Sequence, residues 1–384
     1  MPQSQQENES VRTVKPEVPV YIGLMSGTSM DGVDGVVADF SEISAGKIRI
    51  LGAAHCPFSQ DLRAAAAALQ QSGADEIHRE ALLSQHLAQV YADCVAQLQP
   101  LADEVRAVGV HGQTIRHRPE LGYTRQTNHP ALLAELCGLD VIADFRSRDI
   151  AAGGQGAPLV PSFHMALFGS ATETRVLANI GGISNISILP PDGAVRGFDT
   201  GPGNVLMDGW AQLHLGTPYD ENGSFAASGQ VNTALLDSLM QEAFLQLPAP
   251  KSTGRDLFHL PWLQQHLQSL PAIAAADVQA TLCAYTARTL AQAIAASAPQ
   301  ADAVFVCGGG AYNAELMRRL AAELAAVGCA ARLSQTAELG VVPEQVEALA
   351  FAWLAYCFCE GVTGNLPAVT GAAGTRILGA WYPA

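Results

Sequence analysis

The chain is short of basic residues. Its 384 residues include 21 Lys and Arg against 36 Asp and Glu, which gives a formal net charge of -15. Nucleic acids and anionic membrane surfaces attract proteins through a surplus of Lys and Arg, so this balance argues against both as partners. It does not exclude a nucleotide, because backbone N–H groups, helix N-termini and a magnesium ion can hold phosphates.

Three further features are missing. No apolar run reaches the ~18 residues that a membrane-spanning helix needs. Residues 1–17 are polar and lack the apolar core of a signal peptide, so we expect a disordered tail there. The eight cysteines are scattered without a C-x-x-C pair, which argues against a zinc site and a disulfide framework. These absences favour a protein of the reducing cytoplasm.

Apolar material is plentiful, at 49% of the residues, and the length favours two domains. Segments with strand and helix patterns follow one another, which predicts an α/β protein. The Gly-rich stretch 151–158 predicts a junction. We therefore expect a first lobe of residues 18–148 with a return at about 366–384, and a second lobe of residues 149–365.

The first candidate site is a small-residue turn, 26–32, between predicted strands at 18–24 and 33–40. Glycines and hydroxyl groups let backbone N–H groups approach a polyphosphate, and Asp31 or Asp34 can hold magnesium directly or through water. The turn lacks the Lys of the G-x-x-x-x-G-K-[ST] P-loop. An ordinary hairpin turn is the alternative interpretation.

A second strand–turn–strand unit follows the junction. Gly181 and Gly182 separate predicted strands at 174–180 and 185–189. The unit resembles the first hairpin, which indicates an internal duplication. Two such turns could hold one polyphosphate from both sides, although a purely structural turn remains the alternative.

A glycine triplet forms the third candidate. Gly308, Gly309 and Gly310 lie between a predicted strand at 303–306 and a predicted helix at 314–326. Such a segment lets a flat ligand lie against the backbone at a helix N-terminus, and Asn313 is placed to contact a ribose or base. Glycine triplets also occur for structural reasons alone.

One carboxylate stands in an open, Gly/Pro-rich segment. Asp199 lies within 197–204, where a catalytic base can meet a substrate. Its alternative role is to cap a helix predicted at 205–213.

Polar residues for a substrate pocket occur in three more places. Segment 111–117 offers many donors after a strand, and segment 144–149 contains two Arg, a residue type suited to a bidentate grip on a carboxylate. Structural histidines and interdomain ion pairs are the alternatives. Glu347 lies on an otherwise apolar helix, where a carboxylate needs a partner or a ligand. The polar turn 251–256 could border the site but predicts no chemistry.

Together these motifs resemble the 1,6-anhydro-N-acetylmuramic acid kinase family, within the actin/sugar-kinase/Hsp70-type ATPase superfamily. The resemblance is carried by 25–34 (MSGTSMDGVD), 111–117 (HGQTIRH), 144–161 (DFRSRDIAAGGQGAPLVP), 179–185 (NIGGISN), 197–208 (GFDTGPGNVLMD), 251–255 (KSTGR), 307–313 (CGGGAYN) and the stretch around Glu347. It implies an α/β fold with two lobes and a central cleft, each lobe a mixed sheet flanked by helices.

The resemblance also implies a reaction. Asp199 would act as general base on a water that attacks C1 of the anhydro-sugar, while O6 takes the γ-phosphoryl of ATP with Mg²⁺. The product would be N-acetylmuramic acid 6-phosphate, in cytoplasmic peptidoglycan recycling. The expected partner is the small sugar, not a nucleic acid or a membrane, and the chain could form a homodimer.

The resemblance assigns the remaining residues to two ligands. The residues expected at ATP are Gly27, Thr28, Ser29, Met30, Asp31, Gly32, Val33, Asp34, Gly181, Gly182, Gly308, Gly309, Gly310 and Asn313, with Asp31 at the metal. The residues expected at the sugar are Thr114, Arg148, Asp149 and Glu347.

Two other functions fit the same motifs. A kinase of this architecture could phosphorylate an ordinary sugar hydroxyl, with Asp199 deprotonating that hydroxyl. An ATP-switched binding module is the alternative from another class, but no separate peptide-binding region is visible in the sequence.

Overall fold

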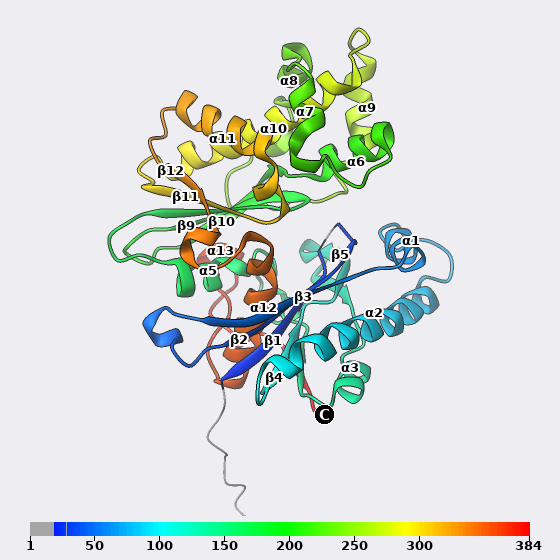
Figure 1. Ribbon diagram of the computed structural model, residues 1–384, viewed down its shortest axis with the longest axis vertical. Coiled ribbons are helices and arrows are strands. Elements are labelled where there is room, and N and C mark those ends of the chain that lie inside the picture. The colour runs from blue at the N-terminus through cyan, green and yellow to red at the C-terminus, as the bar shows by residue number, and fades with distance from the viewer. Residues whose placement is uncertain (1–18, 28) are drawn as a thin grey trace, which may run out of the picture.

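The computed structural model describes residues 19–27 and 29–384. The expected tail over 1–17 and the expected ATP contact Thr28 lie outside the described residues. Figure 1 shows two lobes stacked along the long axis of the molecule. Each is built on a mixed β-sheet.

The first sheet has the strand order β13-β7-β4-β1-β2-β3. Its strands are β1 (Val20–Met25), β2 (Gly32–Asp39), β3 (Arg49–Pro57), β4 (Ala107–Val110), β7 (Val141–Ala143) and β13 (Ala380–Tyr382). Strands β1, β2 and β3 are antiparallel, whereas β4 and β7 continue the sheet in parallel with β1. The C-terminal strand β13 pairs with β7 at the edge of this sheet.

The second sheet repeats this pattern in the order β10-β9-β8-β11-β12. Its strands are β8 (Arg175–Ile180), β9 (Ile183–Leu189), β10 (Arg196–Pro202), β11 (Ala303–Cys307) and β12 (Arg332–Gln335). Strands β8, β9 and β10 are antiparallel, and β11 and β12 follow β8 in parallel. The predicted duplication and the two-lobed α/β fold are therefore confirmed by the topology itself.

Segment 197–204 differs from its prediction as an open stretch. Its first part is β10, paired with β9 from Arg196 to Pro202. The glycines did not prevent a strand, because buried Phe198 and the hydrogen-bonded ladder outweigh their low strand propensity. The register shifts between Asp199 and Gly201, which is a β-bulge beside the candidate base.

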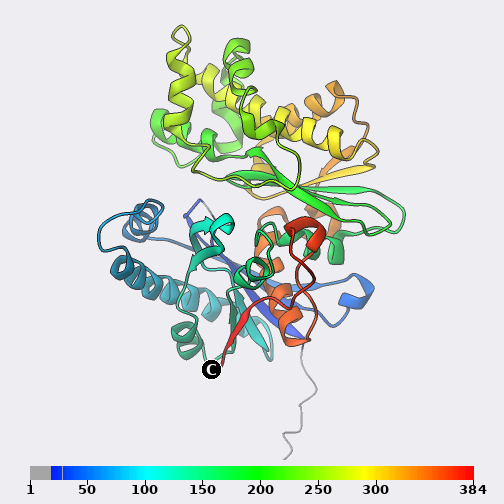
Figure 2. The same cartoon turned by 180° about the vertical axis from the view of Figure 1, so that it is seen from behind.

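The helices cover the two sheets, and Figure 2 shows them from behind. They are α1 (Gln60–Ala68), α2 (Glu76–Leu98), α3 (Pro130–Cys137), α4 (Ser147–Ala151), α5 (Val160–Phe168), α6 (Val205–Leu215), α7 (Ser224–Ser228), α8 (Thr233–Leu239), α9 (Leu260–Gln268), α10 (Ala275–Ser297), α11 (Ala314–Ala326), α12 (Val346–Cys359) and α13 (Pro367–Thr370). The predicted helices within 60–100 and at 276–297, 314–326 and 346–359 are confirmed. None of the helices in the described part of the chain could cross a membrane.

Strand β1 explains how the first lobe is layered. Successive side chains of a strand point to opposite faces. Ile22 packs in the core with α2, and Tyr21 packs in the core with α12. On the same face as Tyr21, Gly23 lets α12 come close, because a Cβ there would lie 2.0 Å from the carbonyl oxygen of Ala348.

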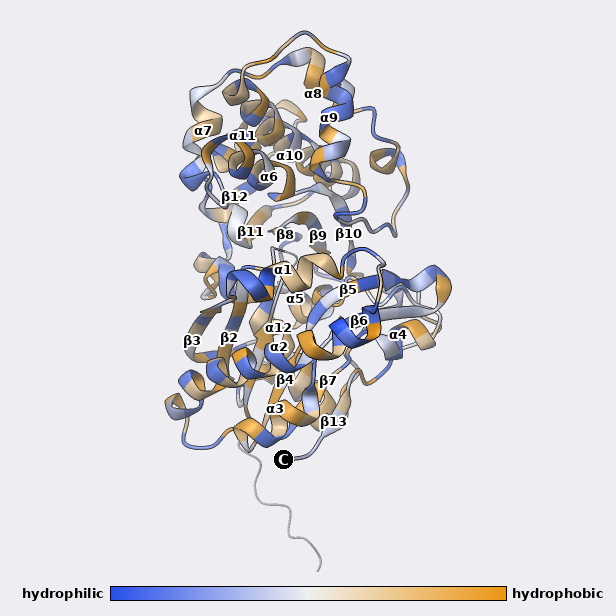
Figure 3. Ribbon diagram, turned by 90° about the vertical axis from the view of Figure 1, so that its right-hand side faces the viewer, coloured by the Kyte–Doolittle hydropathy of each residue, from blue (hydrophilic) through white to orange (hydrophobic). Residues whose placement is uncertain are grey.

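Helix α12 was expected in the second lobe, yet it packs on β1, β2 and β4 of the first sheet. Its residues are apolar on almost every side, as the orange ribbon in Figure 3 shows. One core therefore runs from the first sheet through α12 to Leu177 and Phe305 of the second sheet. The expected division at residues 148 and 366 remains a prediction, with this helix as its exception.

Candidate active site

The first turn joins β1 to β2, and hydrogen bonds to α2 and to the segment after β4 hold it in place. The buried Ser26 hydroxyl lies 2.8 Å from the Tyr91 hydroxyl and donates to the carbonyl of Gly112 at 3.1 Å. The Gln113 amide donates to the carbonyl of Gly27 at 3.1 Å. The turn is thus anchored to the segment after β4, next to the predicted sugar residues.

Two polar residues of the turn are exposed to solvent. Ser29 and Asp31 are exposed, and the Ser29 hydroxyl donates to Asp31 Oδ1 at 2.6 Å. Met30 and Val33 are buried, at 8% and 0% exposure. These two predicted ATP residues can therefore offer a ligand only their backbone. Gly32 is tightly packed, since a Cβ there would lie 2.6 Å from the carbonyl of Cys56.

Asp34, on β2, faces His55 across the β2–β3 pair. Its Oδ1 lies 2.8 Å from His55 Nδ1. Burial raises the pKa of Asp34, and the hydrogen bond from His55 opposes that rise. Both side chains keep almost half of their surface exposed, so this pair adds little to the stability of the fold.

The second turn faces the start of α6. The carbonyls of Gly181 and Gly182 accept hydrogen bonds from the backbone N–H groups of Asn204 at 2.8 Å and Gly203 at 2.9 Å. A Cβ on Gly181 would meet nothing nearer than 3.8 Å. The turn is therefore held on its carbonyl side and has open space beside Gly181 for a ligand.

The glycine triplet lies beside this turn. Gly308 has a left-handed φ of 77° that favours glycine. Gly309 is exposed, and a Cβ on it would lie 3.9 Å from the side-chain nitrogen of Asn204. Gly310 packs under Ile180, where a Cβ would come within 2.4 Å of the Ile180 side chain. Of the three, Gly309 is the one open to a ligand.

Asn313 has a structural role that its prediction as an ATP contact did not include. Its side-chain oxygen accepts a hydrogen bond from the backbone N–H of Leu316 at 2.9 Å and so caps α11. The cap uses the oxygen that a ribose hydroxyl would need.

Asp199 lies on β10 opposite Asn185 and is half-buried. Its Oδ2 accepts a hydrogen bond from the backbone N–H of Thr253 at 2.9 Å. Burial raises the pKa of Asp199 to about 7, while the Thr253 N–H and the charges of Arg146 and Lys251 oppose the rise. A carboxylate with a pKa near the working pH is suited to general base catalysis. The alternative role as a helix cap does not apply, because Asn204 occupies the N-cap position of α6.

Arg146 is a candidate site residue that the sequence analysis placed only within the segment 144–149. Its guanidinium donates to the Gly156 carbonyl at 2.8 Å and contacts His111 Nε2 at 3.0 Å. Burial lowers the pKa of Arg146 to about 10, and the nearby carboxylates of Glu347, Asp199 and Asp149 oppose this. Arg146 therefore links the candidate base electrostatically to the first lobe.

Glu347 lies in the first turn of α12, between the lobes. Its Oε1 accepts a hydrogen bond from the side chain of Asn179, on β8, at 3.4 Å. Burial raises its pKa first of all, Asp34 adds to the rise, and Arg146 opposes it. The structure thus brings Glu347, Asp34, Arg146 and Asp199 into one electrostatic group drawn from both lobes.

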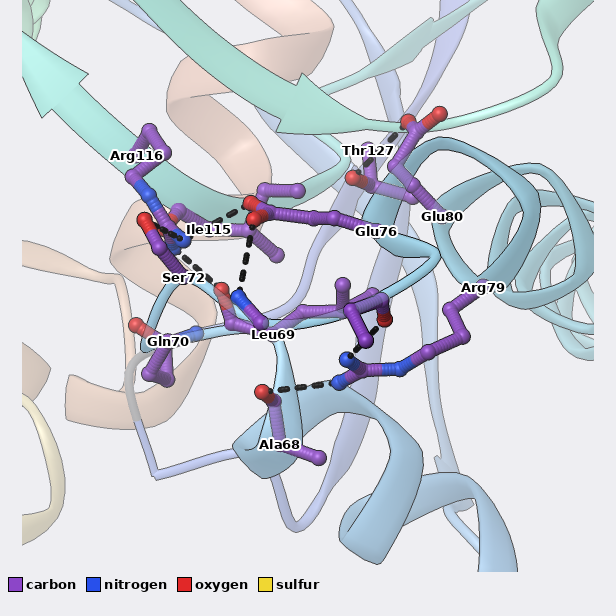
Figure 4. A network of polar contacts seen from close by, with 12 residues as sticks. Ala68, Leu69, Gln70, Ser72, Glu76, Arg79, Glu80, Ile115, Arg116 and Thr127 are labelled. Atoms are coloured by element: carbon purple, nitrogen blue, oxygen red, sulfur yellow. Dashed lines mark hydrogen bonds and ion pairs between the residues drawn. The ribbon is translucent and has the colours of Figure 1, made fainter.

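Thr114 lies on a hairpin that the sequence did not predict, formed by β5 (Gln113–Arg118) and β6 (Tyr123–Thr127). Figure 4 shows how this hairpin is tied to the α1–α2 connection. Arg116 donates to Glu76 at 2.7 Å and to the carbonyl of Leu69, and Thr127 donates to Glu80 at 3.0 Å. Thr114 is therefore held on a rigid support, and its hydroxyl accepts from the Gln126 amide at 3.1 Å.

Arg148 and Asp149 are neighbours on α4 but differ in their exposure to solvent. Arg148 is exposed, and no hydrogen bond or ion pair joins it to another described residue. Asp149 is fully buried and accepts hydrogen bonds from Asn365 at 2.6 Å, Thr370 at 2.8 Å and the N–H of Gly156 at 2.8 Å. The prediction of Asp149 as a sugar contact is therefore wrong, because its oxygens already bind the C-terminal segment.

No group of three or more His, Cys, Asp or Glu side chains in the described part of the chain could hold a metal by itself. Asp31 offers a single exposed carboxylate beside the first turn. This suits magnesium, which commonly takes one or two carboxylates, with the nucleotide phosphates and waters as its other ligands.

Sequence reasoning missed the neighbours that hold Asp199. The backbone N–H of Asp199 donates to the carbonyl of Lys251 at 3.1 Å, and the backbone N–H of Thr253 donates to the Asp199 carboxylate. The turn 251–256 was noticed but given no chemistry. The contact joins residues about fifty positions apart, so no local pattern could have shown it.

Known proteins place the chain in a family. The family model described as "Anhydro-N-acetylmuramic acid kinase" matches residues 19–384. A protein of that name from Burkholderia orbicola (strain MC0-3) is 58% identical over 374 residues, covering 96% of this chain and 97% of the relative. Another, from Cupriavidus metallidurans, is 56% identical over 381 residues, covering 95% and 97%.

A solved structure with a similar course of the chain is the activator of the 2-hydroxyisocaproyl-CoA dehydratase from Clostridium difficile. It has a TM-score of 0.47 and 15% identity, and the match covers 89% of this chain and 96% of that one. The family match and the curated relatives carry the assignment: the chain belongs to the anhydro-N-acetylmuramic acid kinase family and is a phosphotransferase.

Proposed function

We propose that this kinase opens the 1,6-anhydro bond of 1,6-anhydro-N-acetylmuramic acid and phosphorylates O6 with ATP, in peptidoglycan recycling in the cytoplasm. One observation carries the proposal at the level of residues. Asp199 is a half-buried carboxylate that one backbone N–H holds in place, and burial raises its pKa to about 7. A water molecule can lose its proton to such a group near neutral pH.

The proposed reaction balances as follows. Asp199 accepts a proton from water as the water oxygen bonds to C1 and the C1–O6 bond breaks. The released O6 bonds to the γ-phosphorus, and the bond from the γ-phosphorus to the bridging oxygen of ADP breaks. The products are N-acetylmuramic acid 6-phosphate, ADP and one proton. Holding water, sugar and ATP in line supplies much of the rate enhancement.

The sugar side of this site is Thr114, Arg148 and Glu347. The exposed guanidinium of Arg148 suits the lactyl carboxylate of the sugar. Thr114 and Glu347 carry oxygen atoms that can form hydrogen bonds with sugar hydroxyls. The rigid β5–β6 hairpin fixes the position of Thr114. Asp149 supports α4 from within and makes no sugar contact.

The nucleotide side combines the first turn, the second turn and Gly309. Backbone N–H groups in 27–34 and at Gly181 and Gly182 suit the phosphates. Asp31 would hold the magnesium ion, which when bound would neutralise phosphate charge. The acidic chain argues against nucleic acids and anionic membranes as further partners, and a homodimer is compatible with the family.

The test is a product assay with ATP, magnesium and the anhydro-sugar. We expect N-acetylmuramic acid 6-phosphate and ADP in equal amounts, identified by mass spectrometry. A product that keeps the anhydro bridge, or a protein that phosphorylates only sugars with a free 6-hydroxyl, would support the ordinary sugar kinase instead. ATP turnover that does not depend on any sugar would favour a binding module.

A further inference from the structure

The turn from Lys251 to Arg255 is bonded to the strand that carries the candidate base. Backbone and side-chain contacts with Asp199 fix its first half, through Lys251 and Thr253. The Lys251 ammonium donates to the carbonyls of Phe244 at 3.1 Å and Leu245 at 3.0 Å. Arg255 therefore extends from a rigid base two residues after the N–H that holds Asp199.

The guanidinium of Arg255 has unused hydrogen-bonding capacity. Its Nε is buried without a hydrogen-bond partner among the described residues. Among the described residues, no carboxylate oxygen lies within 4.0 Å of the Arg255 guanidinium, so Arg255 forms no ion pair with them. Burying a hydrogen-bond donor without a partner costs free energy. Binding of an anionic acceptor to Arg255 would remove this cost and is therefore favoured.

Two carboxylates, one from each lobe, act electrostatically on Arg255. Burial lowers its pKa, and the carboxylates of Asp208, on α6, and of Asp31, in the first turn, oppose this. Asp208 is itself affected: burial raises its pKa to about 7, Arg255 opposes the rise, and Asp31 adds to it. Arg255 is thus influenced by the charge of Asp31 in the first turn, and its own turn is bonded to Asp199.

We propose that Arg255 binds the γ-phosphoryl group of ATP and stabilises its charge during transfer. The identity of the phosphoryl donor rests on the proposed function. On the proposed function the phosphoryl group passes from the nucleotide at the first turn to the sugar beside Asp199, and the turn that carries Arg255 is bonded to Asp199. A planar guanidinium matches two phosphate oxygens at once, and its charge opposes the charge that spreads over the equatorial oxygens during transfer.

The test compares ADP with a non-hydrolysable ATP analogue by titration calorimetry, and then measures kcat. In Arg255→Gln we expect the affinity for ADP to stay within about 3-fold, the affinity for the analogue to fall at least ~10-fold, and kcat to fall ~100-fold or more. Arg318→Gln is the matched control, because Arg318 is an exposed Arg of the same lobe, paired with Glu315 on α11. It should behave like the wild type.

Wild-type affinity for the analogue together with kcat within about 3-fold in Arg255→Gln would overturn the proposal. If that variant fails to fold, Arg255→Lys decides instead, with about 10-fold losses expected in both quantities because the charge remains without the fork. A Lys variant equal to the wild type would contradict the proposal.

The nucleotide titration needs no sugar, so it judges Arg255 even if the wild type does not phosphorylate the anhydro-sugar and the proposed function fails.

Discussion

The two sheets carry different chemistry at matching places. In the first sheet, the second strand of the antiparallel trio places Asp34 opposite His55 of the third strand. In the second sheet, the corresponding register places Asn185 opposite Asp199. The carboxylate has thus changed strands between two copies of one topology. One copy has its acid on β2, beside the first turn, and the other has it on β10, beside the rigid turn 251–255.

The environments of the two acids explain their different behaviour. Asp34 Oδ1 lies 2.8 Å from Nδ1 of the exposed His55, and this hydrogen bond opposes the rise that burial causes in the pKa of Asp34. Asp199 receives one backbone N–H, and burial raises its pKa to about 7. The same strand order therefore supports a carboxylate paired with a histidine in one lobe and, in the other, the carboxylate that we propose as the proton acceptor.

The largest test of this difference is Asp199→Asn. The amide cannot accept the proton of water, so kcat should fall on the order of 10²-fold or more while ATP affinity stays near the wild-type value. Steady-state kinetics and nucleotide titration measure the two quantities. Near-normal turnover would remove Asp199 from the base role and end the contrast between the lobes.

A structural counterpart is Asp149→Ala. The substitution leaves the Asn365, Thr370 and Gly156 donors without their acceptor, at a cost of about 2–3 kcal/mol in the free energy of unfolding. Urea unfolding measures it. Full stability combined with a large rise in KM for the sugar would restore Asp149 as a sugar contact.

The pH dependence of kcat sharpens the comparison further. Asp199 must be ionised to accept a proton, so kcat should fall about 10-fold per pH unit below a pKa near 7. A profile of kcat from pH 5 to 9 with saturating substrates measures this limb. A flat profile down to pH 5 would mean that the base keeps an ordinary carboxyl pKa.

Arg148→Ala should act on sugar binding alone. The side chain is exposed and has no partner among the described residues, so stability should change by less than ~0.5 kcal/mol. Loss of a bidentate grip should raise KM for the sugar about 10-fold with kcat nearly unchanged. Arg318→Gln is again the control, and an unchanged KM in Arg148→Ala would place the lactyl carboxylate elsewhere.

The smallest effect is expected for His55→Gln. An exposed ion pair contributes ~1 kcal/mol or less, so stability and kcat should both stay within a few-fold of the wild type. Activity and thermal unfolding measure this. A loss as large as that of Asp199→Asn would mean that the first-lobe acid takes part in the chemistry.

Local patterns could predict much of this fold. The strands around both glycine turns and the long helices follow from apolar periodicity and small-residue turns. The β5–β6 hairpin escaped prediction because its strands are polar, with Gln, Thr, Arg and His in place of an apolar alternation.

The site was less accessible from the sequence, because its contacts are long-range. In the sequence, Asp149 is one acidic residue in a polar segment. Its partners Asn365 and Thr370 lie more than two hundred residues away along the chain, so only the fold brings them together. Val33 was expected at ATP from the resemblance, but it lies on β2 and its side chain enters the core, so it can offer only its backbone.

The most direct test of the account is to run the reaction in water enriched in oxygen-18. If Asp199 activates water for attack at C1, the sugar phosphate formed should carry one labelled oxygen at C1 and none at O6. Label should appear at the rate of ADP release, and both rates should fall together in Asp199→Asn. A phosphorylated product without label at C1 would contradict hydrolytic opening of the anhydro bond.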